Sequence, residues 1–112
     1  MRLLTHCLII SYLPTKQDTN YDIPKTVGSL DLFAFSNNIY LQSITIPSSI
    51  TLIPHSAFRF CENLQTITYE GTKQPICEIY PLDNTHPSLV INVPSTYNGT
   101  TFCGKPVTKQ ST

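Results

Sequence analysis

The apolar positions of this chain recur at an interval of 23 residues. The stretch that begins at Ile23 aligns position by position with the stretch that begins at Ile46. Further positions stay apolar without being identical, as where Val27 becomes Ile50. Because each copy keeps the same buried positions, the pattern predicts a solenoid whose coils pack on one another. The residues of the first copy that recur unchanged are Ile23, Pro24, Ala34, Phe35, Leu41, Gln42, Ile44 and Thr45.

Each copy contains a short alternating segment that predicts a β-strand. Ile44 and Ile46 flank Thr45, so a strand turns the two isoleucines to one side and the threonine to the other. Pro47 ends this strand, since proline lacks the N–H that a parallel ladder needs. The second copy repeats the arrangement from Leu64 to Tyr69. We therefore expect parallel strands that lie side by side, one from each coil.

The rest of each copy predicts turns and a second wall. Ser48-Ser49 suits a turn, and Ile50 and Ile53 then return to the core. Ala57-Phe58, like its counterpart in the first copy, supplies one small and one large side chain to the far wall.

Asn38 and Cys61 occupy the same place in the two copies. Repeats with this spacing commonly carry Asn or Cys at a buried turn, where the side chain satisfies backbone groups. We therefore interpret Cys61 as a structural residue rather than a reactive thiol.

A third, degenerate coil is expected after the two clear copies. The segment Ile91-x-Val93-Pro94 matches Ile44-x-Ile46-Pro47, whereas the part from Gly71 to Ser88 lacks the Ala-Phe pair and has gained prolines. Terminal repeats are often atypical because they close the core against water. The expected organisation is an N-terminal apolar segment and linker (1–20), a solenoid (21–94), and a C-terminal cap with a polar tail (95–112).

Two motifs carry a resemblance to a known family. The pattern LxxIxIPxSIxxIxxxAFxxCxxLxxI, from Leu41 to Ile67, resembles the 23-residue leucine-rich repeat of BspA-like surface proteins of oral bacteria and parasitic protists. The ending IxVPSxYxxxxFCGxPVTK, from Ile91 to Lys109, resembles the C-terminal segment of the protist members. The resemblance implies a leucine-rich-repeat solenoid shaped as a short horseshoe. Parallel strands would line its concave face, and short strands, turns or helical turns its convex side.

The resemblance also implies a function. Proteins of this family act in cell-surface adhesion and in binding host or matrix proteins, and no enzymatic activity is attached to their repeats. Members usually carry many repeats, and at least three coils are normally needed for a stable stack. With two clear copies, this chain is expected to be either a short member or a truncated fragment of a longer repeat protein.

Composition narrows the classes of partner. Charged residues make up 12% of the chain and the net charge is zero, so there is no basic footprint for nucleic acid and no polybasic membrane patch. No apolar run reaches the ~18 residues that a membrane span requires. The segment Met1 to Pro14 has two interpretations, a signal-peptide-like leader or an N-terminal edge strand at Leu8–Ile10.

The chain has four cysteines, Cys7, Cys61, Cys77 and Cys103. Cys77 and Cys103 flank the degenerate coil and lie outside the regular repeat, so we predict that they form a disulfide if the protein is exported. In a reducing cytosol they would remain thiols. Asn98 begins the sequence Asn-Gly-Thr, an N-glycosylation acceptor that has meaning only on the secretory path.

Known catalytic and metal-binding motifs are missing from the sequence. There is no CxxC, HExxH or nucleophile-elbow pattern, and no Gly-rich phosphate loop. The intervals between His55, Cys61, Cys77 and His86 fit no standard zinc spacing. The sequence therefore predicts that the chain is not an enzyme and that it binds no metal or cofactor.

The candidate binding surface consists of the outward strand positions on either side of each central apolar residue. These side chains are small and form hydrogen bonds, so they would suit a peptide or a sugar, although an ordinary sheet surface carries the same residues. A stable interface buries roughly 1,200 Å² or more, so weak, multivalent adhesion is expected from so short a solenoid. The positions are Asn20, Asp22, Ser43, Thr45, Thr66, Thr68 and Asn92.

Two functions follow from these observations. The first is a non-enzymatic adhesion module of a cell-surface or secreted protein, a surface antigen that recognises protein or glycan partners. The second is an intracellular repeat scaffold that docks to other repeat proteins and keeps its cysteines reduced. A fragment with no function of its own is a third outcome, recognisable by the absence of cooperative unfolding.

Overall fold

The fold is described from a computed structural model that defines residues 8–10 and 18–110. Within these residues the chain forms eleven short strands and no helix. The strands are β1 (Leu8–Ile10), β2 (Asn20–Asp22), β3 (Val27–Leu30), β4 (Ser43–Ile46), β5 (Leu52–Ile53), β6 (Thr66–Tyr69), β7 (Ile76–Cys77), β8 (Val90–Val93), β9 (Thr101–Phe102), β10 (Lys105–Pro106) and β11 (Thr108–Lys109).

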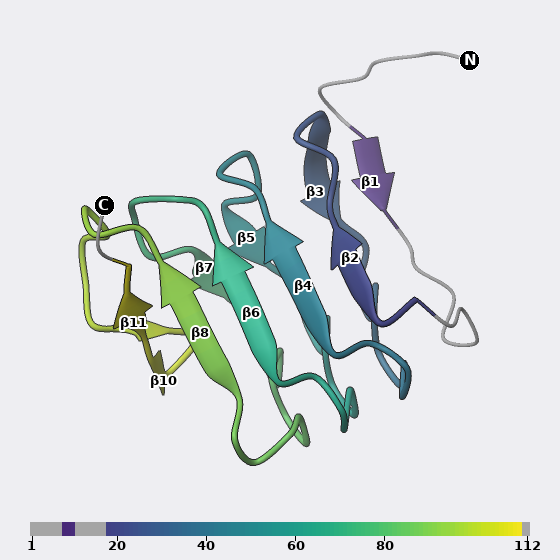
Figure 1. The fold of residues 1–112 in the computed structure, drawn as a ribbon. Coiled ribbons are helices and arrows are strands. Elements are labelled where there is room, and N and C mark those ends of the chain that lie inside the picture. Colours follow the sequence, from purple (N-terminus) through teal and green to yellow (C-terminus); the bar gives the residue numbers. More distant parts are fainter. Residues whose placement is uncertain (1–7, 11–17, 111–112) are drawn as a thin grey trace.

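The main sheet is parallel throughout and has the order β11-β8-β6-β4-β2 (Figure 1). Its register follows the sequence repeat, because Ile44 of β4 lies beside Ile67 of β6 and Thr45 beside Thr68. The strands from β2 to β8 come from successive coils of about 23 residues, and β11 comes from the C-terminal tail. The predicted leucine-rich-repeat solenoid with one parallel strand per coil is confirmed.

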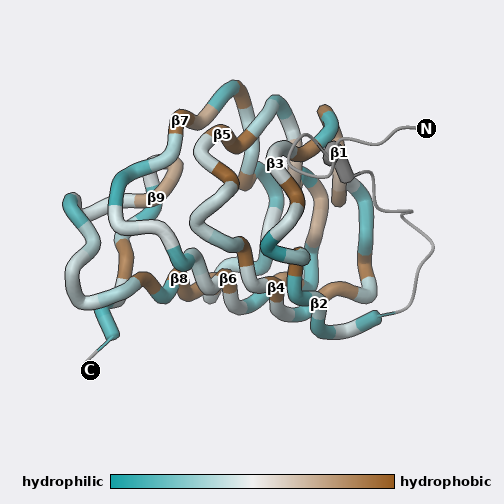
Figure 2. Tube along the Cα trace, turned by 90° about the horizontal axis from the view of Figure 1, so that it is seen from above, coloured by the Kyte–Doolittle hydropathy of each residue, from teal (hydrophilic) through white to brown (hydrophobic). Residues whose placement is uncertain are grey.

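A second wall of short strands lies behind the main sheet. Strand β1 pairs with β3, and β5 pairs with β7, both in parallel. Figure 2 looks along the strands and separates the two walls, with β2, β4, β6 and β8 in one row and β1, β3, β5 and β7 in the opposite row. Leu8–Ile10 forms an N-terminal strand, as one of the two interpretations of this segment predicted. The remainder of the candidate leader Met1 to Pro14 lies outside the described residues.

Consecutive turns complete each coil between the back wall and the next strand of the main sheet. Alternate backbone N–H groups donate to the following coil, from Phe33 to the carbonyl of His55 (3.2 Å) and from Phe35 to that of Ala57 (2.8 Å). The intervening N–H groups donate three residues back, as from Ala34 to Asp31. The two sets of bonds satisfy this buried backbone without a helix.

The core is one continuous column of aliphatic and aromatic side chains between the two walls. The Phe35 and Phe58 rings of successive coils stack with their centroids 5.2 Å apart and their planes 6° from parallel. This repetition of identical contacts is the reason that the apolar positions recur in the sequence. The fully buried large side chains are Phe35, Leu41, Ile44, Ile46, Ile50, Ile53, Phe58, Leu64, Ile67, Ile91, Tyr97 and Phe102.

The third coil keeps the backbone path of the first two although its sequence has diverged. Its strand β8 pairs with β6, and Pro81 and Leu82, both buried, take the place of Ala57-Phe58. The left-handed φ angles of the turns also recur, at Phe33 (59°), Ser56 (56°) and Tyr80 (57°). The degenerate coil that the sequence predicted is therefore present.

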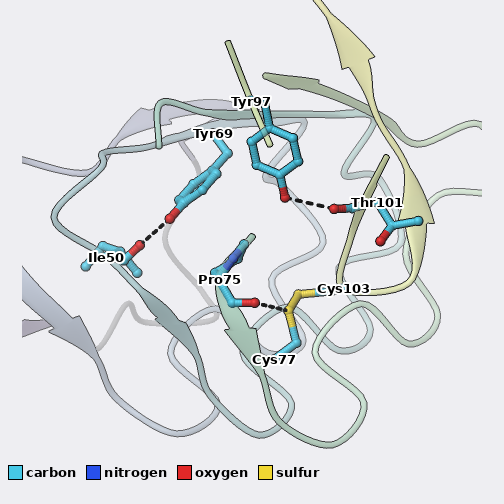
Figure 3. Close-up of a disulfide and its surroundings, with 7 residues drawn as sticks. All are labelled: Ile50, Tyr69, Pro75, Cys77, Tyr97, Thr101 and Cys103. Carbon is cyan, nitrogen blue, oxygen red and sulfur yellow. Dashed lines mark hydrogen bonds between the residues drawn. A yellow bond between two sulfur atoms is a disulfide. The ribbon is translucent and has the colours of Figure 1, made fainter. Parts of the chain in front are cut away.

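The C-terminal segment closes the open end of the column. Tyr69 replaces the isoleucine of the earlier coils, and its ring contacts those of Phe102 (centroids 5.2 Å apart) and Tyr97 (6.4 Å). The Tyr69 hydroxyl donates to the carbonyl of Ile50 (2.7 Å), and the Tyr97 hydroxyl to that of Thr101 (2.8 Å). Figure 3 shows the Tyr69 and Tyr97 rings beside the disulfide between Cys77 and Cys103.

Candidate functional site

The solvent-facing side of the main sheet, here called the sheet face, brings the candidate binding residues together in two rows. Asn20, Ser43 and Thr66 are register partners in the first row, which continues to Val90. The second row runs through Asp22, Thr45, Thr68 and Asn92 to Thr108. All seven residues expected from the sequence therefore lie on one surface.

Strand geometry explains why these side chains reach solvent. In β4 the neighbours of Thr45, Ile44 and Ile46, are fully buried, so Thr45 must point to the opposite side. The threonines at the centre of the face are half-buried, whereas Asn20 and Asp22 at its edge are exposed. With strands about 4.8 Å apart, the five strands give a face roughly 19 Å wide.

The sheet face is polar and carries little charge. Asp22 is the one carboxylate in the two rows. Some hydroxyl and amide groups bond to each other, since Ser43 Oγ donates to Asn20 Oδ1 and Gln110 Nε2 donates to Asn92 Oδ1 (2.9 Å). Hydroxyl groups both donate and accept, so Thr45, Thr66 and Thr68 can bind either kind of polar group on a partner.

Two residues of the sheet face were not expected from the sequence. Val90 stands in the first row and is 44% exposed. Its position before Ile91 could have indicated that it lies on the sheet face, but its apolar side chain does not match the polar pattern of the other residues. Thr108 extends the second row from the C-terminal tail, where no repeat indicates a strand.

A hollow of about 460 Å³ opens at the carboxyl ends of the central strands, and Thr68, Glu70 and Gln110 are among its lining residues. A tight turn follows each neighbouring strand. After β4 this turn is closed by the hydrogen bond from the Ile50 N–H to the Pro47 carbonyl (3.1 Å). After β6 the chain instead extends toward the C-terminal cap. The hollow lies where a third tight turn would have stood, and it continues the sheet face because Thr68 belongs to both.

The cysteines separate into two groups. Cys77 and Cys103 form a disulfide with their Cα atoms 5.4 Å apart. Cys77 of β7 lies beside Ile53 of β5, so the disulfide links the third coil to the cap. Cys61 is fully buried and donates a hydrogen bond to the Phe35 carbonyl (2.9 Å). Burial raises the pKa of the Cys61 thiol to about 12, so the thiolate is scarce at neutral pH, and its predicted structural role agrees with these contacts.

Asn98, the glycosylation candidate, is exposed in the cap. Its backbone N–H donates to the Thr72 carbonyl (2.6 Å), so the sequon begins in a backbone-paired segment. The sequon stays a prediction.

The described part of the chain contains no group of three or more His, Cys, Asp or Glu side chains placed to hold a metal ion. Of the four His and Cys residues whose intervals were compared with zinc sites, Cys77 is in the disulfide and His55 contacts the rings of Phe33 and Tyr80. In the same residues no helix has the length and hydrophobicity to span a bilayer.

Comparison with known proteins yields one match. The family model described as "BspA type Leucine rich repeat region (6 copies)" matches residues 14–97, about three quarters of the chain. No curated protein and no solved structure matches the chain. The matched region includes the strands from β2 to β8 and thus most of the sheet face.

Proposed function

This chain belongs to the BspA-type leucine-rich repeat family, and from that premise we propose that it is the binding module of a cell-surface or secreted adhesion protein. Repeats of this type form protein-interaction domains, and the module proposed here is non-enzymatic. It recognises protein or glycan partners through the sheet face. The supporting observation is the row of small hydrogen-bonding side chains that runs unbroken from Asp22 to Thr108 across five parallel strands, beside a second row that is polar from Asn20 to Thr66 and ends at Val90.

The form of the sheet face indicates the kind of binding. A face about 19 Å wide cannot alone reach the roughly 800 Å² per partner of a standard interface. Each contact is therefore weak, and adhesion depends on many copies displayed together. The hollow at the strand ends adds a recess beside Thr68 that a protruding side chain or a sugar ring would fill.

A matched pair of variants tests the sheet face. The protein is displayed on beads at high density and applied to an array of purified matrix proteins and glycans. Thr45→Arg places a long charged side chain on the face and is expected to abolish binding to any ligand captured by the wild type. Thr96→Arg adds the same charge at an exposed turn outside the face and is expected to leave binding unchanged. Equal effects of the two variants would contradict the proposal.

Localisation separates this proposal from an intracellular scaffold. An exported protein is expected to carry the Cys77–Cys103 disulfide and a glycan on Asn98, both visible in the mass of the native protein without reduction. A chain that lacks Met1 to Pro14 is expected to stay inside the cell. Free thiols at Cys77 and Cys103 together with unmodified Asn98 would favour the scaffold.

A further inference from the structure

Large apolar side chains are exposed on the wall opposite the sheet face. We define the back patch as Leu32, Phe33, His55, Ile79 and Tyr80. The exposed fractions are 55% for Leu32, 52% for Phe33, 57% for Ile79 and 56% for Tyr80. Exposed apolar groups that gather in one place mark interaction sites, whereas scattered ones do not.

The back patch is one continuous surface across three coils. The His55 ring lies 5.5 Å from the Phe33 ring and 6.3 Å from the Tyr80 ring, centroid to centroid. The Arg59 guanidinium lies 5.2 Å from the centre of the Tyr80 ring and pairs with Asp83 at 3.3 Å. Aromatic residues and arginine are the side chains that contribute most to binding at protein interfaces.

The back patch presents the same succession of residue types whether its three coils are followed from the first to the third or from the third to the first. Hydrogen bonds between coils place the positions in register, since Phe33 N–H donates to the His55 carbonyl and Ser56 N–H to the Ile79 carbonyl. One row is then Leu32, His55, Ile79, which is aliphatic, histidine, aliphatic. The neighbouring row is Phe33, Ser56, Tyr80, which is aromatic, serine, aromatic.

We propose that the back patch is the interface of a symmetric dimer of this chain. In a two-fold dimer the same patch serves both subunits, so it must be complementary to itself. A two-fold axis across the middle coil, perpendicular to the solenoid, places Leu32 against Ile79 of the second copy and Phe33 against Tyr80 of the second copy. The two His55 side chains then meet near the axis.

The net charge and the size of the chain also allow a second copy to bind. Arg59 pairs with Asp83, and Glu78 accepts from the His55 backbone N–H (3.1 Å). The chain has zero net charge, so two copies do not repel each other. A standard interface of about 800 Å² per partner would take roughly an eighth of the 6299 Å² surface.

The dimer is independent of which partner the sheet face binds. With the back walls together, the two sheet faces point away from each other, which makes the assembly bivalent.

Sedimentation velocity over a range of concentrations tests the proposal. The wild type is expected to show a monomer–dimer equilibrium. The double variant Phe33→Ser/Tyr80→Ser is expected to weaken the dimer by about thirtyfold or more, as for loss of the two aromatic contacts between the subunits. It should fold, because Ser56 already adopts the same left-handed φ at this position of the middle coil. Val90→Thr, which removes an exposed apolar group from the opposite wall, is the control and is expected to keep the dimer.

Cross-linking tests the two-fold geometry in a Cys7→Ser background. On oxidation His55→Cys is expected to link to itself. Leu32→Cys is expected to link only when mixed with Ile79→Cys. A monomeric wild type at about 1 mM, well above the micromolar range of weak dimers, would overturn the proposal and assign the patch to a different protein. It would equally be overturned by a dimer that survives the double variant, or by Leu32→Cys that links to itself.

Discussion

At the scale of single residues, one buried position of the repeat is filled in two chemically different ways. The Asn38 side-chain oxygen accepts from the N–H groups of Tyr40 (2.9 Å) and Leu41 (3.1 Å). Cys61, at the same place one coil later, donates its thiol to the Phe35 carbonyl of the previous coil. The Asn38 side-chain oxygen therefore closes its own turn, and the Cys61 thiol links its coil to the previous one. The two residues should not be interchangeable.

Replacing Asn38 by leucine tests the turn-closing role. The substitution removes the acceptor of two N–H groups, and an unsatisfied buried group costs about 1–3 kcal/mol. We expect the free energy of unfolding, measured with urea, to fall by about 2–4 kcal/mol. The same substitution at Asn63, whose amide donates to the Ile39 carbonyl at an exposed site, is expected to cost about 1 kcal/mol. Equal losses would show that the buried acceptor has no special role.

The Cys61 thiol makes the fold sensitive to alkali. Its pKa is raised by burial from 9.0 to about 12, so between these values the unfolded chain loses a proton that the folded chain keeps. The stabilisation is complete below pH 9, and stability then falls by up to about 1.4 kcal/mol per pH unit. Urea unfolding at pH 8 and pH 10.5 measures this loss. The variant Cys61→Ala should be less stable at pH 8 but lose less on going to pH 10.5, and an unchanged loss would place the alkaline sensitivity elsewhere.

At the scale of elements, the end of β6 departs from the repeat in a coordinated way. Tyr69 stands where Ile46 stands one coil earlier, and Gly71 stands where Ser48 stands. A Cβ atom on Gly71 would lie 2.7 Å from atoms of the Tyr69 ring. The larger side chain that contacts the cap thus requires the smaller one two residues later.

A double-mutant cycle measures this coupling. Gly71→Ala is expected to destabilise the protein by about 1–3 kcal/mol, the usual cost of overpacking. In a Tyr69→Ile background the same change should cost little, because the ring that it contacts is gone. Urea unfolding of the four proteins gives the interaction energy. Additive effects of the two substitutions would contradict the coupling.

Strand β1 makes the N-terminal segment part of the fold. It pairs with β3 through Leu8, Ile9 and Ile10. Removing residues 1–10 takes these backbone partners from β3, and at about 0.5–1.5 kcal/mol for each hydrogen bond we expect a loss of about 1–3 kcal/mol in urea unfolding. An unchanged unfolding midpoint would show that β1 adds nothing to stability. A native N-terminus beyond Ile10 in the exported protein would show that the working protein lacks this strand.

The sequence predicted the parts of the fold that repeat. Ile44 and Ile67 lie in register because the apolar spacing allows only one face of each strand to be buried. The turns at Phe33 and Phe60 were not predictable in detail, since bulky side chains rarely adopt a left-handed φ. Hydrogen bonds between the coils impose that conformation. Val90 and Thr108 of the sheet face were not predicted, because Val90 breaks the polar pattern and Thr108 lies in a tail without a repeat.

At the scale of the whole molecule, each coil contacts only its neighbours. Stability in such a stack is a sum over coils and the interfaces between them, so the ends open before the middle. The two ends differ in this protein. At the C-terminal end the Cys77–Cys103 disulfide and the ring contacts of Tyr69 hold the cap on the third coil. At the other end β2 is the edge strand of the main sheet.

Removal of the disulfide is therefore predicted to act locally. The double variant Cys77→Ser/Cys103→Ser frees a loop of 26 residues, for which the expected loss of stability is about 3 kcal/mol. In hydrogen exchange followed by mass spectrometry, amides of β8 and β11 should exchange faster, while those of β4 keep their protection. If exchange rose equally in all strands, the protein would open as one cooperative unit, and the nearest-neighbour description of the solenoid would be wrong. A change confined to the cap would instead show that the coils before it form a stack that is stable by itself.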